Sequence, residues 1–201
     1  MNNDQQNVNN AKSQEELSEV LQVRRDKLTK LQDMGRDPFH VSRYDRTSDS
    51  MKIKNDFENF EGKVVKIAGR IMSKRIQGKA GFIDIQDQEG RIQCYVRLDR
   101  IGEEEYSIFS TYDIGDILGI EGEVFKTKKE EISVKANEVL LLSKSLQILP
   151  EKYHGLKDQD LRYRQRYVDL IVNPEVKQAF LTRTKALKAL RSYLDERGFL
   201  E

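Results

Sequence analysis

The chain has 201 residues, of which 37% are hydrophobic and 34% charged, and its formal net charge is +1. This composition is typical of a soluble protein with a modest core, and no apolar run approaches membrane-spanning length. The single cysteine, Cys94, excludes an internal disulfide and a multi-cysteine metal site. No metal site of another kind is predicted either. The start, MNNDQQNVNN, has neither the basic nor the apolar part of a signal peptide, so a cytoplasmic protein is expected.

The amino-terminal part is predicted to be a disordered tail followed by a helical segment. Residues 1–12 are rich in Asn and Gln, which is typical of disorder. Ser13 and Glu16 fit a capping box at a helix start, and an apolar stripe continues to a stop at Gly35. A second short helix is predicted near 53–60, which completes a helical segment over 13–62. We predict that the outer face of the first helix carries four cations, which either form a solvated surface or contact an RNA backbone: Arg24, Arg25, Lys27 and Lys30.

A strand-rich domain is predicted over residues 63–148, with a helix at 103–112. The alternation of apolar residues predicts five strands, at 63–75, 81–87, 91–98, 117–126 and 131–143. Three strands, a helix and two strands is the order of an OB-fold, a five-stranded barrel that binds oligonucleotides on the face of strands two and three. The predicted fold class is therefore α+β, mainly β; another small barrel without a ligand is the alternative.

An aromatic residue of the second strand faces away from the predicted core. The alternation that turns Ile83 inward turns Phe82 outward, and on the third strand it places Gln93 and Tyr95 beside Phe82. The segment 63–97 carries eight Lys and Arg against three acids, which leaves a local charge of +5. A ring, amides and cations on one open face suit an unstacked nucleobase and its phosphates.

Glu138 breaks the pattern of the fifth strand. Ile132, Val134 and Ala136 set an inward parity that Glu138 should continue, although an unpaired buried carboxylate is costly. Either a β-bulge turns Glu138 outward, or its carboxylate accepts hydrogen bonds from a specific partner.

The character of the sequence changes after residue 148. A connector is predicted over 149–173, and its segment DLRYRQRYVDL interleaves arginines with tyrosines, which suits either phosphate binding or packing between domains. Asn173-Pro174 predicts a helix start, and an apolar stripe continues to Gly198 without an evident partner in the chain. No glycine-rich phosphate loop, Gly-x-Ser-x-Gly elbow or His-Glu-x-x-His pair is present, so no catalytic residue is predicted.

Three stretches resemble the amino-terminal part of bacterial-type class II lysyl-tRNA synthetases: GRIMSKRIQGKAGFIDIQD with GRIQCYV, NEVLLLSKSLQILPEKYHGL, and DLRYRQRYVDLIVNPEV. The resemblance implies that the barrel binds the anticodon loop of lysine tRNA, whose bases are uridine-rich. Phe82 would stack on the central anticodon base, while Arg75, Gln93 and Glu138 would hydrogen-bond to base edges or hold the loop. Lys74 and Lys79 join the four helix cations as candidates for RNA-backbone contacts.

The resemblance also implies the activity of a complete enzyme, a homodimer that uses ATP and Mg²⁺ to form lysyl-adenylate and transfers lysine to the 3′ end of its tRNA. Residues 174–201 would be the first helix of its catalytic domain, which this chain truncates before the second and third class motifs. The chain alone is therefore expected to bind no ATP or Mg²⁺ and to be inactive, with no DNA or membrane partner. The alternatives are an aspartyl- or asparaginyl-type synthetase domain and a free-standing barrel that binds single-stranded nucleic acid.

Overall fold

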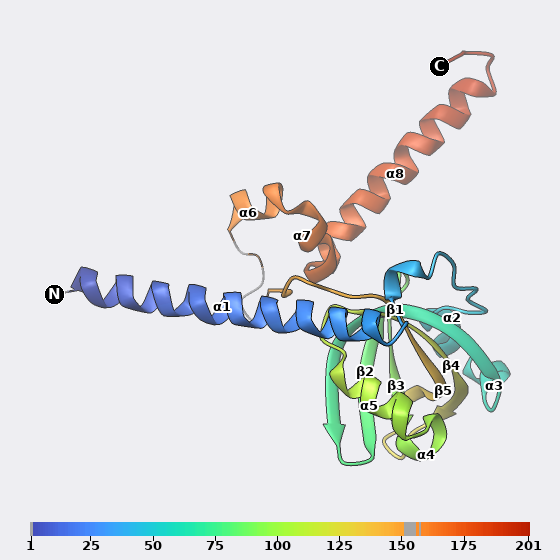
Figure 1. The fold of residues 1–201 in the computed structure, drawn as a ribbon. Helices are drawn as coiled ribbons and strands as arrows, with labels where there is room; N and C mark the ends of the chain where they lie inside the picture. Colours follow the sequence, from blue (N-terminus) through green and yellow to red (C-terminus); the bar gives the residue numbers. More distant parts are fainter. Residues whose placement is uncertain (1, 151–155, 157) are drawn as a thin grey trace. The chain divides into compact units, whose positions relative to one another are not determined.

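The computed structural model describes residues 2–150, 156 and 158–201, with the backbone alone for residues 2–17. The chain divides into two compact units, Met1–Ile148 and Leu149–Glu201. The first unit is built around a closed barrel with helices on its outside, and the described part of the second unit is helical (Figure 1).

The barrel has the strand order β1-β2-β3-β5-β4. Neighbouring strands are antiparallel except β3 and β5, which run parallel. The strands are β1 (Val64–Gln77), β2 (Ala80–Gln86), β3 (Arg91–Arg97), β4 (Ile117–Lys126) and β5 (Ile132–Ser143). The predicted OB-fold is confirmed, and each strand lies within two residues of its predicted bounds.

The core of the barrel follows from the period-two alternation of its strands. Ile83 and Ile85 of β2 point inward, as do Ile92, Cys94 and Val96 of β3, and all are buried. Burial raises the pKa of the Cys94 thiol far above its ordinary value, with a smaller contribution from Asp84. Cys94 is therefore a protonated core residue and not a nucleophile.

Two helices cover the barrel between β3 and β4, namely α4 (Leu98–Ile101) and α5 (Glu103–Thr111). Phe109 of α5 is buried against β2. A Cβ atom at Gly81 would lie 2.9 Å from the Phe109 ring, so only glycine permits this approach of the helix to the strand.

The first helix, α1 (Asn2–Asp33), begins earlier than the sequence predicts. The backbone is helical from Asn2, whereas the sequence predicts a disordered tail over 1–12 and a helix start at Ser13. Once a helix is nucleated, each added residue gains a hydrogen bond at little further cost, which allows polar residues to extend it. The predicted stop is confirmed: Gly35 has a φ of +71°, and Arg36 donates to the Leu31 carbonyl at 2.8 Å.

A neutral group of buried charges ties α1 to the barrel. The Lys144 ammonium lies 2.7 Å from a carboxylate oxygen of Asp116 and 2.5 Å from one of Asp113, and the Lys144 and Asp116 side chains are fully buried. Lys27 of α1 places its own ammonium 2.6 Å from Asp113. Burial opposes the ionisation of Asp113, but hydrogen bonds from Lys144 and Lys27 outweigh burial and lower the pKa of this carboxyl.

The link between α1 and the barrel contains the short helices η1 (Pro38–His40), α2 (Ser50–Asn55) and α3 (Phe57–Phe60). The helix predicted near 53–60 is thus two helices, because Asp49 caps the first one earlier by accepting a hydrogen bond from the Lys52 amide at 2.8 Å. Asp87, at the end of β2, accepts hydrogen bonds from the amide and hydroxyl of Ser50 at 2.6 and 2.7 Å. These bonds fasten α2 to the β2–β3 turn.

The second unit contains α6 (Gln159–Arg164), α7 (Arg166–Val172) and α8 (Pro174–Asp195). The predicted start of α8 at Asn173-Pro174 is confirmed, and the helix ends three residues before Gly198. Asp169 is buried and accepts hydrogen bonds from Arg162, Arg166 and Asn173, so two of the connector arginines are engaged within the unit. Residues 151–155 and 157 of the predicted connector lie outside the described residues.

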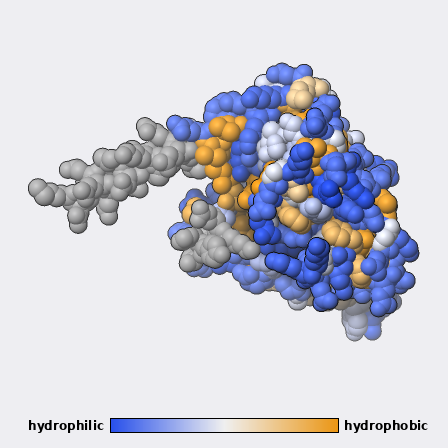
Figure 2. Space-filling model, turned by 90° about the horizontal axis from the view of Figure 1, so that it is seen from below, coloured by the Kyte–Doolittle hydropathy of each residue, from blue (hydrophilic) through white to orange (hydrophobic). Residues whose placement is uncertain are grey.

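The surface of the described residues is mostly hydrophilic in the view of Figure 2, with hydrophobic residues scattered between polar ones. Among the helices that the structure describes, none has the length and apolar character needed to cross a membrane.

Candidate nucleic-acid interface

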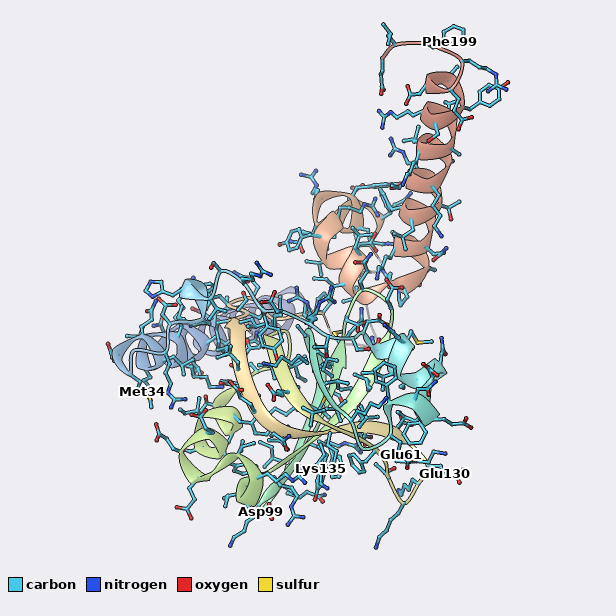
Figure 3. All side chains as sticks on the ribbon, turned by 90° about the vertical axis from the view of Figure 1, so that its right-hand side faces the viewer. Met34, Glu61, Asp99, Glu130, Lys135 and Phe199 are labelled. Atoms are coloured by element: carbon cyan, nitrogen blue, oxygen red, sulfur yellow. The ribbon has the colours of Figure 1, made fainter. Side chains whose placement is uncertain are left out.

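Two rows of side chains cross the outer face of the barrel. The strand register pairs Arg75 with Phe82, Phe82 with Tyr95, and Tyr95 with Lys135. Lys135 of this row, which also pairs with Glu123 of β4, lies near the lower end of the barrel in Figure 3. The neighbouring row consists of Ser73, Asp84, Gln93 and Ser133. Because paired residues of adjacent strands lie on one face of a sheet, Arg75, Phe82 and Gln93 share one surface, as their predicted roles require.

The Phe82 ring stacks on the ring of Tyr95, with centroids 4.6 Å apart and planes inclined by 22°. Both side chains are partly exposed, and Tyr95 also approaches Phe125 of β4 at a centroid distance of 6.3 Å. Tyr95 covers one face of the Phe82 ring, so a base can stack only on the other face, toward β1 and Arg75. The ring pair also restrains the Phe82 side chain before a ligand arrives, which lowers the entropy cost of binding.

Gln93 is held by a polar contact to β5. Its amide oxygen lies 3.2 Å from the Ser133 hydroxyl, whose single proton can be donated to this oxygen or to the Glu131 carbonyl at 3.3 Å. The amide nitrogen has no partner among the described residues, so it remains available as a donor. Beside Gln93, the Asp84 carboxylate is engaged by the hydroxyl of Ser73. Gln93 therefore has a donor available on the face of the barrel that carries Phe82.

Arg75 and Lys79 are exposed beside Phe82, Arg75 on β1 and Lys79 in the turn between β1 and β2. In the part of the chain that the structure describes, neither side chain takes part in an ion pair. Both cations are therefore available to a ligand, and their predicted roles stay predictions: a contact to the RNA backbone for Lys79, and a bond to a base edge or to the loop for Arg75.

Lys74 has a different role from the one predicted. Its ammonium donates to the carbonyl oxygens of Phe109, Ser110 and Tyr112 at 3.0, 2.9 and 2.6 Å, which closes the end of α5. Burial lowers the pKa of Lys74 to about 8. The prediction of an RNA-backbone contact is wrong for Lys74, because its three protons are used inside the fold. The alternation of the strand could have predicted this, because successive side chains of a strand point to opposite faces and Arg75 points outward.

Arg24 and Lys27 also face the fold and not solvent. Arg24 is 7% exposed, and its guanidinium donates to the carbonyl oxygens of Ser145, Gln147 and Ile114 at 2.9, 2.8 and 3.1 Å. Lys27 is paired with Asp113 as described above. The prediction that Arg24 and Lys27 lie on the outer face of the helix is therefore wrong. The spacing could have indicated this for Arg24, because it lies seven residues before the buried Leu31, and residues seven apart lie on the same side of a helix. Arg25 and Lys30 are exposed, and their predicted RNA contact stays a prediction.

Glu138 is turned outward by a β-bulge, the first of the two alternatives that the sequence left open. The β4–β5 register shifts between Glu121 and Gly122, which leaves Asn137 as the extra residue and exposes Glu138 opposite Glu121. Gln93 pairs instead with Ser133, near the other end of β5. The structure therefore does not bring Glu138 together with Arg75, Phe82 and Gln93.

The sequence analysis missed the contribution of β5 to this surface. Ser133 and Lys135 enter it only because β5 pairs in parallel with β3, a long-range contact that no local pattern reveals. Among the described residues, no group of three or more His, Cys, Asp or Glu side chains is arranged to hold a metal ion. The surface combines a ring pair, an amide, hydroxyls and cations, and groups of these kinds suit a nucleobase and its phosphates.

Comparisons with known proteins agree with this architecture. The family model of the OB-fold nucleic acid binding domain matches residues 65–142, and that of the class II tRNA synthetases (D, K and N) matches residues 158–201. A lysine–tRNA ligase of Thermoanaerobacter sp. (strain X514) is 61% identical over 100% of this chain and 40% of its own length. The lysine–tRNA ligase of Clostridium perfringens (strain 13 / Type A) is 53% identical over the same shares. That of Syntrophomonas wolfei subsp. wolfei is 55% identical over 95% of this chain and 38% of its own length. The chain thus spans about 40% of the length of the curated relatives it matches.

Proposed function

We propose that the chain, which is 61% identical over its full length to a lysine–tRNA ligase, belongs to that family, that it is the anticodon-binding part of such an enzyme, and that its barrel binds the anticodon loop of lysine tRNA. The observation that carries this proposal is the outward Phe82 ring, restrained by Tyr95 and flanked in register by Arg75 and Gln93 on one open face. A partly exposed ring on an open face is accessible to a ligand, and nucleobases are ligands that stack on such rings.

In this proposal the central anticodon base stacks on the free face of Phe82, on the side of β1. Stacking of a base on an aromatic side chain contributes about 1–3 kcal/mol and does not discriminate strongly between bases. The positive charge of Arg75 lies beside the stacked base and neutralises a neighbouring phosphate. Phe82 and Arg75 together therefore supply affinity.

Discrimination falls to Gln93. Ser133 holds its amide oxygen, so the amide nitrogen faces the ligand as a donor. Uracil presents carbonyl oxygens that accept such a bond, whereas cytosine replaces one of them with an amino group, which would leave two donors opposed. A uridine at the central position therefore fits this site better than a cytidine. Glu138 is left out of the proposed site because it lies on a different part of the barrel surface.

The test is a titration of the 201-residue chain with the anticodon stem-loop of lysine tRNA, measured by fluorescence anisotropy. Replacing the central uridine with cytidine should weaken binding about tenfold or more, because a site with an unpaired polar group rejects the mismatched base. The same replacement in the stem serves as a control and should leave affinity unchanged when base pairing is restored. Equal affinity for both loops would support the competing class, a barrel that binds single strands without sequence preference.

The relatives' names favour the lysine enzyme over the aspartyl and asparaginyl types, and we extend the proposal to the complete enzyme. It would activate lysine with ATP and Mg²⁺ to lysyl-adenylate and transfer lysine to the 3′ end of the tRNA, in the cytoplasm where translation takes place. Residues 158–201, which match the class II synthetase model, would begin its catalytic domain. Leu187, Leu190 and Leu194 are exposed on α8 within its unit and would meet the second subunit of a homodimer.

The chain alone is expected to be inactive in lysine activation, because its class II match covers only its last 44 residues, 158–201. The measurement is lysine-dependent ATP–pyrophosphate exchange with the 201-residue chain, beside a complete lysine–tRNA ligase as positive control. Exchange above the rate without lysine would contradict this expectation, while leaving the anticodon proposal untouched.

A further inference from the structure

A hollow of about 350 Å³, named here the α1–α5 hollow, opens where the end of α1, η1, α5 and the second half of β5 meet. Much of its wall is apolar and consists of the side chains of Leu31, Val41, Ile108, Val139 and Leu141. One cation, Arg36, stands against two carboxylates, Asp37 and Glu105, which leaves a charge of −1 on the wall. The volume lies at the lower end of the range of ligand pockets, about 300–1,000 Å³.

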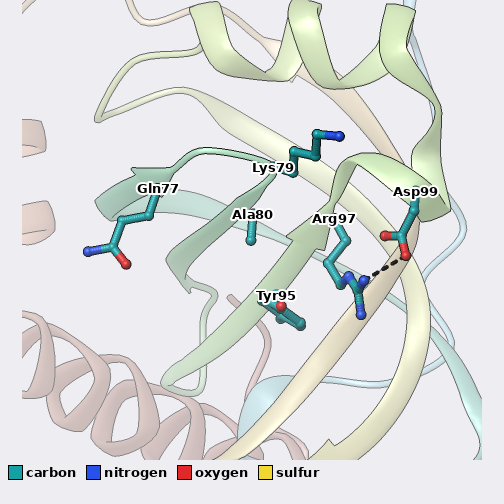
Figure 4. A pocket seen from close by; sticks show the side chains of 6 residues that line it. All are labelled: Gln77, Lys79, Ala80, Tyr95, Arg97 and Asp99. Atoms are coloured by element: carbon teal, nitrogen blue, oxygen red, sulfur yellow. Dashed lines mark hydrogen bonds and ion pairs between the residues drawn. The ribbon is translucent and has the colours of Figure 1, made fainter.

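Another hollow of similar size has the opposite charge. It measures about 360 Å³ and lies beside Tyr95, with Gln77, Lys79, Ala80, Arg97 and Asp99 around it (Figure 4). Lys79 and Arg97 against Asp99 leave a charge of +1 there. This hollow shares the outer face of Tyr95 and so belongs to the candidate nucleic-acid interface. It offers a comparison of equal size and opposite charge.

Tyr112, the residue that follows α5, brings a hydroxyl without a partner to the α1–α5 hollow. The residue is 6% exposed, yet its hydroxyl makes no hydrogen bond in the part of the chain that the structure describes. Burial raises the pKa of Tyr112 most, Glu105 adds to this rise and Arg36 opposes it, so the hydroxyl lies close enough to both side chains to sense their charges. Both side chains line the same hollow. A buried hydroxyl that lacks a partner lowers stability, and a ligand can recover this loss.

Glu105 supplies a second free acceptor. Its Oε1 accepts a hydrogen bond from the Arg36 guanidinium at 2.6 Å, whereas its Oε2 has no partner among the described residues. The Asp37 carboxylate is already engaged, since its two oxygens accept from the Phe39 amide and from the Gln32 side-chain amide, each at 2.9 Å. The groups left for a ligand are therefore a carboxylate oxygen, which only accepts, and a hydroxyl, which can accept. Both suit a donor that carries positive charge.

We propose that the α1–α5 hollow binds a primary aliphatic amine. The protonated amino group donates to Glu105 Oε2 and to the Tyr112 hydroxyl, and the methylene chain lies against the apolar wall. Such an amine is charged at pH 7, and burial of its chain removes apolar surface from water. The site is independent of RNA binding, because none of its residues lies in the outer rows that carry Phe82 and Gln93.

The test is an NMR titration of the ¹⁵N-labelled 201-residue chain at pH 7 with n-pentylamine, n-pentanol and pentanoate, which share one chain length. Pentylamine should shift the amide signals of Ile108, Tyr112 and Leu141 and saturate at a concentration about tenfold lower than pentanol, because a charged donor forms stronger hydrogen bonds than a neutral one. Pentanoate should not saturate, since the carboxylates on the wall repel it. The amides of Ala80 and Arg97, at the positive hollow of Figure 4, should not shift with pentylamine. Equal affinity for pentanol and pentylamine would overturn the proposal, because the hollow would then select only apolar chains.

A primary ammonium on a methylene chain occurs both in free amines and in the lysine side chains of a partner protein. Nα-acetyl-lysine methylamide, which adds the peptide groups, separates the two sources. Binding at least as tight as that of pentylamine would identify a partner's lysine, whereas binding about tenfold weaker would identify a free amine, because the hollow then excludes the peptide groups. The proposal fails if neither probe binds.

Glu105→Gln and Glu104→Gln separate a specific contact from overall charge. Both glutamates pair with Arg36, at 2.6 and 3.0 Å, but only Glu105 lines the hollow. Glu105→Gln should weaken pentylamine binding about tenfold, whereas Glu104→Gln should leave it unchanged within about twofold. An equal loss in the two variants would mean that only overall negative charge attracts the amine, which would overturn the proposed site.

Tyr112→Phe and Tyr106→Phe form a second matched pair, because both tyrosines are 6% exposed. The Tyr106 hydroxyl donates to the Gly78 carbonyl at 3.0 Å, whereas the Tyr112 hydroxyl is unbonded among the described residues. Tyr106→Phe should therefore lower the Tm by about 2–4 °C and leave amine binding intact. Tyr112→Phe should not lower the Tm, and it should weaken pentylamine binding about fivefold. Unchanged pentylamine affinity in folded Tyr112→Phe would contradict the proposal.

Discussion

Phe82 and Phe109 are the same residue type in two environments. One lies on the outer face of the barrel, where it can bind a ligand, and the other is buried, where it stabilises the fold. Phe82 lies on the outer face against Tyr95, whereas Phe109 is buried beneath β2. Lys74 and Lys79 form a similar contrast, since the first closes α5 and the second is exposed in the β1–β2 turn. These two pairs allow binding and folding to be tested separately.

Phe82→Ala should weaken binding of the anticodon stem-loop about tenfold or more, because base stacking is lost. It should lower the free energy of unfolding by only about 1 kcal/mol, the order of a single aromatic contact. Phe109→Ala is the control and should cost about 3–5 kcal/mol, because it empties a packed core position. Urea unfolding and anisotropy titration give the two quantities. A Phe82→Ala barrel that unfolds as readily as Phe109→Ala would show that the ring belongs to the core.

Lys74→Met and Lys79→Met should have opposite effects. Lys74→Met keeps an apolar stem but leaves three carbonyl oxygens without their donor, so it should lower the free energy of unfolding by about 1–3 kcal/mol. Lys79→Met should leave stability within about 0.5 kcal/mol and weaken RNA binding, since an exposed cation is removed. The two measurements are chemical unfolding and stem-loop affinity at fixed salt. A larger loss of affinity in folded Lys74→Met than in Lys79→Met would contradict the assignment.

At the scale of elements, α1 depends on polar anchors as much as on its apolar stripe. Arg24 spans three backbone carbonyls, and Lys27 reaches the buried group of Asp113, Asp116 and Lys144. Removing one member of such a group leaves an uncompensated buried charge. The resulting loss of stability exceeds the net stabilisation that the intact group provides. The position of α1 on the barrel is therefore sensitive to the protonation of Asp113.

The lowered pKa of Asp113 predicts a pH dependence of stability. The ionised carboxylate binds protons more weakly in the folded than in the unfolded chain, so its contribution is fully present above the unfolded value near 3.8. That contribution is lost as the pH falls through the lower folded value. Asp113→Asn should therefore be less stable than the wild type at pH 7, and the difference should shrink below pH 4. Urea unfolding between pH 7 and 3 measures this, and a constant difference over the range would contradict it.

The regular elements were predictable because they depend on local patterns. The strand predicted at 117–126 is found at Ile117–Lys126, since period-two alternation is set by neighbouring residues. The predicted start of the amino-terminal helix at Ser13 differs from the start at Asn2 in the structure, because a capping signal does not prevent a helix from continuing through it. Local sequence patterns thus predict where helices and strands lie more accurately than they predict where each one begins or ends.

The candidate site was predictable in part, for a related reason. The facing of Phe82 and Gln93 follows from alternation within β2 and β3. The partner of Gln93 is Ser133, 40 residues later, and the acceptors of Arg24 are about 90–120 residues away, so no local pattern identifies them. The residues that support and restrain the site are therefore the ones that only the closed barrel defines.

At the scale of the whole molecule, the net charge of +1 means that the proposed RNA binding depends on one face and not on the overall field. The acidic residues of the chain lie largely outside the segment 63–97, and the surface is mostly hydrophilic (Figure 2). A nearly neutral protein attracts polyanions weakly at long range, so it binds RNA without a matching loop poorly.

Affinity for the stem-loop should therefore depend only modestly on salt. About three phosphate contacts, from cations such as Arg75, Lys79 and Lys135, predict a slope of log K against log salt of about −2. Titrations between about 50 and 200 mM salt measure the slope, and Lys79→Met should make it shallower by about 0.7, the value for one contact to a single strand. A slope near −7 would mean that binding is driven by a much larger basic surface.

The parallel pairing of β3 with β5 sets the order in which this molecule can become functional during its synthesis. Phe82 and Gln93 emerge from the ribosome early, but Ser133 and Lys135 emerge about 40 residues later. Until β5 is made, Gln93 lacks the hydroxyl that orients it and the barrel lacks the strand that closes it. A nascent chain that ends before β5 thus carries the Phe82 ring without the Ser133 hydroxyl beside Gln93, and the proposed recognition of uridine requires the last strand of the barrel to pair.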